Sequence, residues 1–126
     1  MALIIEDDLD IASASSLRLQ AAGLDTLIAA SAEEGLAVAA ARHPDVIVLD
    51  IRLPKMDGLA ALRALSMQTG TKDIPVVALS ACVGHKLAAL EQGARYFLKK
   101  PCEASQLIDA VQATIGRPRP SVNESS

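Results

Sequence analysis

Aromatic side chains are nearly absent from this chain of 126 residues, which has one Tyr, one Phe and no Trp. Modules that bind nucleic acid by stacking bases depend on aromatic side chains, so the sequence argues against that class. The two aromatic residues are neighbours, Tyr96 and Phe97. Hydrophobic residues still make up 51% of the chain, which excludes disorder over most of it and predicts a single aliphatic core.

Cysteine and histidine are also scarce, with two residues of each. Cys82 and Cys102 are too few for a disulfide framework or a structural zinc site. His43 and His85 are isolated and lack metal-ligand spacing. We expect the cysteines to be two unrelated small core residues rather than a regulatory disulfide.

Neither sign of charge dominates, because 12 Lys and Arg residues stand against 15 Asp and Glu residues. A protein that binds the phosphate backbone of nucleic acid needs a surface rich in Lys and Arg, so we expect no direct contact with nucleic acid. No stretch approaches the roughly 18 apolar residues of a membrane span, and Glu6 comes too early for a signal peptide. The prediction is a cytoplasmic protein with no membrane segment.

Short apolar runs alternate with amphipathic segments along the chain. The predicted strands are 2–5, 25–29, 45–49, 74–79 and 94–98, and the predicted helices are 9–22, 31–42, 59–67, 86–92 and 103–115. This alternation predicts an α/β fold, a doubly wound parallel sheet with helices on both faces. The domain is predicted to span 1–116, followed by a flexible Pro- and Ser-rich tail over 117–126.

Polar residues with complementary chemistry follow four of the predicted strands. They are Glu6 and Asp7, Asp50, Ser80 and Lys100, in chain order. In a parallel sheet these positions meet at one edge, which is where α/β proteins bind ligands. Three carboxylates placed close together need a cation or a raised pKa, and Mg²⁺ prefers oxygen ligands of this kind.

Each of these residues also has an ordinary structural interpretation. Acidic residues after a strand often stabilise the first turn of a helix, and a single Asp or Ser is a common helix cap. Lys99 and Lys100 alone would be surface charge. Capping does not explain the ordered combination, which favours phosphoryl chemistry with Asp50 as nucleophile and with Lys100 and Ser80 contacting the phosphoryl group.

The segments that carry these residues closely resemble the receiver domain of two-component response regulators. The matching segments are 3–8, 44–58, 75–81, 93–94 and 97–101, and the resemblance covers 2–116. It implies a flavodoxin-like (βα)5 fold with strand order 2-1-3-4-5. It also implies a phosphoacceptor signalling domain of a phosphorelay, which is not an enzyme beyond catalysing its own phosphorylation and dephosphorylation.

The resemblance also implies roles for individual residues. Asp50 would accept the phosphoryl group from a histidine kinase, a phosphotransfer protein or a small phosphodonor. The implied Mg²⁺ ligands are Glu6, Asp7, Asp50 and the backbone carbonyl of Arg52. Lys100 would contact the phosphoryl group, and its bond to Pro101 would be cis. Asp8 matches a more variable position of the family and ranks below the acidic pair as a ligand.

Two further residues resemble the switch of the family. Ser80 resembles the hydroxyl that moves toward the phosphoryl group, and Phe97 resembles the aromatic residue that then turns inward. The change would reshape the face formed by 86–92, 94–98 and 103–115, through which a downstream protein target would bind.

The sequence departs from the family pattern in two places. The segment between Ser80 and Lys100 is about two residues shorter than usual, which puts the position of the helix over 86–92 in question. Cys102 replaces a common aromatic residue. Two alternatives therefore stay open: a pseudo-receiver, which is an interaction module that is never phosphorylated, and a phosphate-handling enzyme of another α/β class.

Overall fold

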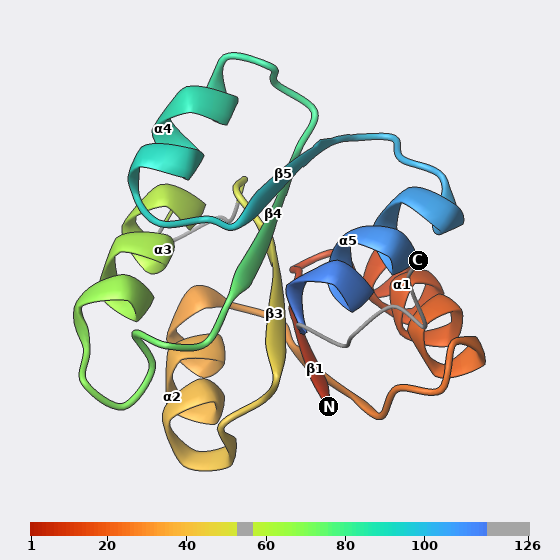
Figure 1. Cartoon of the computed structure of the whole chain (residues 1–126), viewed down its shortest axis with the longest axis horizontal. Coiled ribbons are helices and arrows are strands. Elements are labelled where there is room, and N and C mark those ends of the chain that lie inside the picture. The colour runs from red at the N-terminus through yellow and green to blue at the C-terminus, as the bar shows by residue number, and fades with distance from the viewer. Residues whose placement is uncertain (53–56, 116–126) are drawn as a thin grey trace, which may run out of the picture.

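The computed structural model describes residues 1–52 and 57–115, and in that part of the chain five strands alternate with five helices (Figure 1). The strands are β1 Ala2–Ile5, β2 Thr26–Ala29, β3 Val46–Asp50, β4 Val76–Ser80 and β5 Tyr96–Lys99. The helices are α1 Leu9–Ala21, α2 Ala32–Arg42, α3 Gly58–Met67, α4 His85–Glu91 and α5 Ala104–Thr114. The predicted tail over 117–126 lies outside the described residues.

All strand pairs are parallel, and the strand order is β2-β1-β3-β4-β5, as predicted. From β1 the chain moves outward to β2 and then returns to place β3 on the other side of β1. This reversal opens a crevice beyond the carboxyl ends of β1 and β3, which is where such sheets bind ligands.

The two faces of the sheet are covered by different helices. Alternate side chains of a strand point to opposite faces. Leu3 and Ile5 of β1 therefore belong to the core that includes side chains of α2, α3 and α4, whereas Ala2 and Ile4 belong to the core that includes side chains of α1 and α5. Figure 1 shows the same division, with α1 and α5 on one side of the sheet. All four residues of β1 are buried, which explains why the strand has no polar alternation in its sequence.

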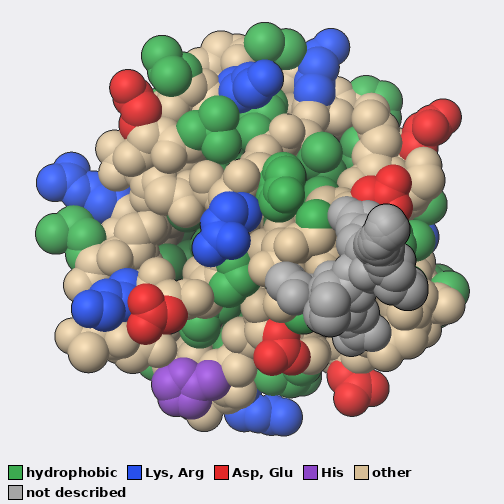
Figure 2. Space-filling view, in the orientation of Figure 1, with side chains coloured by type: hydrophobic (Ala, Val, Ile, Leu, Met, Phe, Trp, Pro, Cys, Tyr) green, Lys and Arg blue, Asp and Glu red, His purple; other side chains and the backbone are tan. Residues whose placement is uncertain are grey.

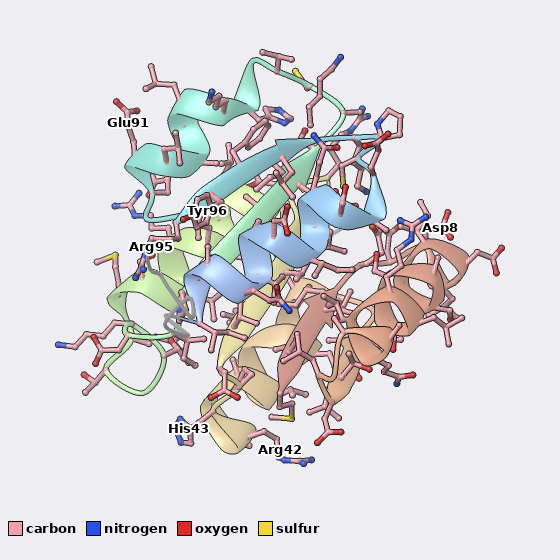
Figure 3. All side chains as sticks on the ribbon, turned by 45° about the vertical axis from the view of Figure 1, so that its right-hand side comes forward. Asp8, Arg42, His43, Glu91, Arg95 and Tyr96 are labelled. Carbon is pink, nitrogen blue, oxygen red and sulfur yellow. The ribbon has the colours of Figure 1, made fainter. Side chains whose placement is uncertain are left out.

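Side-chain hydrogen bonds cap the beginnings of several helices, among them α1 and α2. Asp8 lies just before α1 (Figure 3). Its Oδ1 accepts the backbone N–H groups of Asp10 at 3.0 Å and of Ile11 at 3.2 Å. Ser31 Oγ accepts the N–H of Glu34 at 3.1 Å at the start of α2. The Glu34 carboxylate accepts the N–H of Ala30 instead of that of Ser31, so only half of a capping box forms.

The adjacent aromatic residues have different surroundings. Phe97 is half-buried and packs against the core shared with α3 and α4, whereas Tyr96 is 40% exposed on β5 (Figure 3). This matches the alternation expected within a strand.

Both cysteines are free. The prediction that both are core residues is wrong for Cys82, which is exposed because it lies in the turn between β4 and α4 rather than on a strand. Cys102 is half-buried and packs against the core on the side of α1 and α5.

None of the helices within 1–52 and 57–115 combines the length and the apolar character that crossing a bilayer requires. On the face in Figure 2, Lys and Arg side chains lie apart from one another, and acidic side chains lie on the same face. This face is therefore of mixed charge rather than a basic stripe.

Candidate functional site

Four strands deliver polar side chains to one edge of the sheet. Glu6 follows β1 and Lys100 follows β5, as expected. Asp50 and Ser80 differ slightly from the expectation, because they are the last residues of β3 and β4 rather than the first residues after them. They pair in the sheet register with Leu79 and Lys99, so the ladder fixes their backbones.

Three carboxylates meet at this edge. One ligand oxygen from each of Glu6, Asp7 and Asp50 lies within 4.8 Å of the others. Glu6 and Asp50 are buried, with 4% and 5% exposure, whereas Asp7 is exposed. The acidic groups therefore form a half-open set of hard oxygen donors, a donor set that Mg²⁺ favours.

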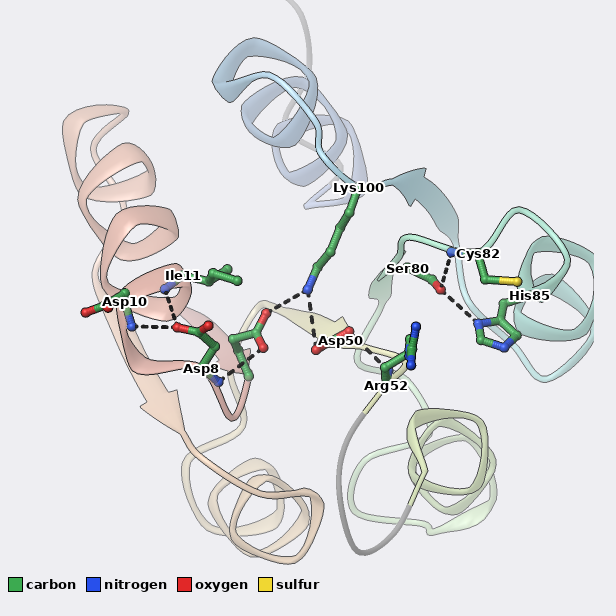
Figure 4. A network of polar contacts seen from close by, with 10 residues as sticks. Asp8, Asp10, Ile11, Asp50, Arg52, Ser80, Cys82, His85 and Lys100 are labelled. Atoms are coloured by element: carbon green, nitrogen blue, oxygen red, sulfur yellow. Dashed lines mark hydrogen bonds and ion pairs between the residues drawn. The ribbon is translucent and has the colours of Figure 1, made fainter.

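Lys100 joins two of these carboxylates (Figure 4). Its Nζ lies 3.0 Å from Oε1 of Glu6 and 3.4 Å from Oδ2 of Asp50. Burial by itself would lower the pKa of Lys100, but the two carboxylates outweigh this effect and raise the pKa above its ordinary value. The ammonium group stays charged, and the peptide bond to Pro101 is cis, as the resemblance implied.

Glu6 is the most perturbed carboxyl group of the site. Burial raises its pKa to about 7, the neighbouring Asp50 adds to the rise, and Lys100 opposes it. Its Oε2 also accepts the N–H of Asp8 at 3.3 Å. Glu6 and Asp50 thus share one ammonium group while Asp7 lies close to both, and a divalent cation at this edge would relieve the remaining repulsion.

The turn after Asp50 is held against the end of β3. Oδ1 of Asp50 accepts the N–H of Arg52 at 3.1 Å, and the N–H of Gly58 donates to the carbonyl of Ile51 at 2.7 Å. A Cβ atom on Gly58 would lie 2.3 Å from the Cα of Ile51, so only glycine fits there. Residues 53–56 lie outside the described part, and a ligand role for the Arg52 carbonyl stays a prediction.

The Ser80 hydroxyl is fully buried and faces away from the acidic cluster. Oγ accepts the N–H of Cys82 at 3.0 Å and lies 2.8 Å from Nδ1 of His85. Figure 4 shows His85 on one side of the hydroxyl and Asp50 on the other. His85 is not among the site residues predicted from the sequence. Its signal was its position five residues after Ser80, in the segment that is shorter than usual.

A cavity of about 410 Å³ adjoins the site on the side of α1 and α5. Its walls include Ile11 and Arg18 of α1, Leu107 of α5, and Lys100. Neither Glu6 nor Asp50 lines it, so it is separate from the cluster of carboxylates.

Known proteins resemble this chain in sequence and in fold. The family model of the response regulator receiver domain matches residues 2–112. The DNA-binding dual master transcriptional regulator RpaA of Synechocystis is 36% identical over 117 residues, which are 91% of this chain and 48% of that protein. The transcriptional regulatory protein PrrA of Mycobacterium tuberculosis is 34% identical over 126 residues, covering 98% of this chain and 53% of that protein.

Two solved structures show a similar fold. The Francisella response regulator 1452 receiver domain has a TM-score of 0.85 and 31% identity, covering 92% of this chain and 96% of that one. The receiver domain of the sensor histidine kinase PA1611 from Pseudomonas aeruginosa, a crystal structure with a magnesium ion in the active site cleft, has a TM-score of 0.84 and 27% identity, covering 92% and 97%.

The chain spans about half the length of the curated relatives that it matches, with shares of 48% and 53% for RpaA and PrrA. The family model covers the residues of this chain that form the five-stranded sheet and its acidic edge. The chain therefore belongs to the response regulator receiver domain family of two-component systems.

Proposed function

We propose that this chain accepts a phosphoryl group on Asp50 in a Mg²⁺-dependent reaction and that phosphorylation changes its binding to a downstream protein. The observation that carries the proposal is the buried pair Glu6 and Asp50, held 3.0 Å and 3.4 Å from the same Lys100 ammonium at the edge where the sheet reverses. The proposed donor is a histidine kinase or a phosphotransfer protein. Because such a kinase uses ATP, the proposal places the chain in the cytoplasm.

The residues of the site suit this transfer. An Asp50 oxygen would attack phosphorus as the bond from phosphorus to the donor nitrogen or oxygen breaks, giving an acyl phosphate. Lys100, already beside Oδ2, would neutralise charge on a phosphoryl oxygen. The N–H of Arg52, which donates to Oδ1, would hold the other oxygen and so orient the carboxylate.

The donor set fits a magnesium ion. Glu6, Asp7 and Asp50 offer oxygen atoms within 4.8 Å of one another, and the exposed Asp7 leaves one side open to water. We propose these three side chains and the Arg52 carbonyl as the protein ligands. When bound, Mg²⁺ would neutralise the charge that develops on the phosphoryl oxygens.

The proposed output surface is formed by α4, β5 and α5. Several large apolar side chains are exposed on α4 and β5, including Leu87 at 68%, Leu90 at 39% and Tyr96 at 40%. Phe97 pairs with Ala78 in the register, two positions before Ser80, so its half-buried ring lies along the strand pair that leads to the site. In the proposal, movement of Ser80 toward the phosphoryl group lets Phe97 turn inward and reshapes this surface.

RpaA is a DNA-binding regulator. We propose that the present chain acts through protein contacts and that contact with DNA requires a separate domain. The proposed role is that of a phosphorylated regulator rather than an enzyme with a substrate of its own.

Beryllofluoride, which imitates a phosphoryl group on a carboxylate, tests the proposal against a pseudo-receiver. With Mg²⁺ present, beryllofluoride is expected to raise the thermal midpoint of the wild-type chain, because a ligand of the folded state stabilises it. Asp50→Asn should remove the rise, and Asp73→Asn, at an exposed position, should keep it. Equal responses of wild type and Asp50→Asn would favour the pseudo-receiver, and turnover of a small phosphate ester would favour the enzyme.

A further inference from the structure

The Ser80 hydroxyl has two hydrogen-bond partners, the N–H of Cys82 and Nδ1 of His85. A serine hydroxyl has one O–H to donate and two lone pairs that accept. The N–H of Cys82 uses one lone pair at 3.0 Å, and Nδ1 of His85 lies at 2.8 Å. If Nδ1 accepts, the only proton of Ser80 points to His85 and cannot be donated to an oxygen atom on Asp50.

A tight turn brings His85 into this position. The carbonyl of Cys82 accepts the N–H of His85 at 3.1 Å, and the carbonyl of Val83 accepts the N–H of Lys86 at 3.0 Å. These bonds fold the chain back within five residues of Ser80, so the first residue of α4 reaches the end of β4. His85 is half-buried, so the side chain, including Nε2, is not enclosed in the core.

We propose that His85 is a positioning residue that holds the Ser80 hydroxyl away from Asp50 in the unphosphorylated protein, with Nδ1 as the acceptor. This inference rests on the proposed function of Asp50. A phosphoryl group on Asp50 must compete with His85 for the Ser80 proton. The contact therefore opposes the phosphorylated conformation, and its release frees the first residue of α4, next to the proposed output surface.

The first test examines the unphosphorylated protein and needs no phosphoryl chemistry. Nitrogen-15 NMR at pH 8, where imidazole is ordinarily neutral, should show that Nδ1 of His85 is unprotonated and that Nε2 carries the proton. The chain has one other histidine, and His43→Asn assigns its signals, because Asn tolerates the left-handed backbone there. A proton on Nδ1 would overturn the proposal.

The second test measures beryllofluoride affinity with Mg²⁺ present. His85→Ala is expected to bind about three- to tenfold more tightly than wild type, since one hydrogen bond no longer competes. His85→Asn, whose amide oxygen can accept the same bond, should return most of the way to the wild-type affinity. In a Ser80→Ala background, His85→Ala should change nothing further.

The outcomes separate this inference from the proposed function. If wild type binds beryllofluoride and His85→Ala binds within twofold of it or more weakly, the role of His85 is wrong and the role of Asp50 stands. If the wild-type chain does not bind beryllofluoride, the proposed function is wrong, and so is the role of His85 in opposing the phosphorylated conformation. If His85→Ala does not fold, the nitrogen-15 signal of Nδ1 of His85 in the wild-type chain provides the test. The inference predicts that saturation with beryllofluoride removes the signal of a hydrogen-bonded Nδ1, and an unchanged signal would overturn it.

Discussion

Glu6 shows how the chemistry of the site depends on single residues. Its carboxyl group is buried beside Asp50, and this burial raises its pKa to about 7 although Lys100 opposes the change. A carboxyl with a raised pKa binds a proton more tightly in the folded than in the unfolded state. In the absence of metal, Glu6 therefore stabilises the fold most fully below about pH 4.5, and this contribution is lost as the pH rises toward 7.

The same shift predicts how Mg²⁺ affinity depends on pH. A metal ion needs the deprotonated carboxylate, so a proton on Glu6 competes with it. Below pH 7 the Mg²⁺ affinity should fall, by at most about tenfold per pH unit, and above pH 8 it should level off. Titrations with Mg²⁺ at pH 6, 7 and 8, followed by the backbone amide signals of Asp7 and Arg52, measure the dependence.

Glu6→Gln provides the control for this dependence. Its amide is nearly isosteric and does not titrate, so the variant should bind Mg²⁺ more weakly and with a shallower pH dependence over the same range. An affinity of wild type that is equal at pH 6 and pH 8 would contradict the assignment of Glu6.

At the scale of elements, the sequence pattern predicts most of the fold. Apolar runs bounded by Gly, Pro and charged residues identify all five strands. The runs are continuous in β1, β3 and β4 because these strands are buried on both faces and cannot tolerate polar alternation. The predicted and observed ends of the strands and helices differ by at most two residues. Asp50 and Ser80, for example, still pair within the sheet, since ladder hydrogen bonds form irrespective of side-chain polarity.

The contacts between side chains could not be predicted in the same way. Parallel topology alone predicts that the ends of four strands converge. This convergence brings together Glu6 and Lys100, which are 94 positions apart in the sequence. The contact between His85 and Ser80 depends on the conformation of a short turn, and no periodic pattern encodes such a conformation.

Gly58 gives a prediction at this scale. Its missing Cβ lets the start of α3 approach the backbone of Ile51, and backbone atoms cannot move aside as a flexible side chain can. Gly58→Ala should therefore lower the free energy of unfolding by about 1–3 kcal/mol, measured by urea denaturation. Gly70→Ala is the matched control, because nothing lies within 4 Å of its added Cβ, and an equal loss in both variants would contradict the argument.

At the scale of the whole molecule, the site exists only when the sheet is assembled. Its groups come from the segment after β1, the last residues of β3 and β4 and the segment after β5, and two separate helix layers pack against the two faces of the sheet. The carboxylates and Lys100 are thus fixed by the same packing that forms the core. The proposed output surface and the proposed switch depend on one event, the transfer of a phosphoryl group to Asp50, which the proposed Mg²⁺ site would assist.

Intact-protein mass spectrometry after incubation with acetyl phosphate and Mg²⁺ tests that event most directly. The wild-type chain should gain the mass of one phosphoryl group, Asp73→Asn should gain the same mass, and Asp50→Asn should gain none. Omitting Mg²⁺ should abolish or greatly slow the gain. A wild-type chain without added mass, or an Asp50→Asn chain that still gains it, would contradict the account.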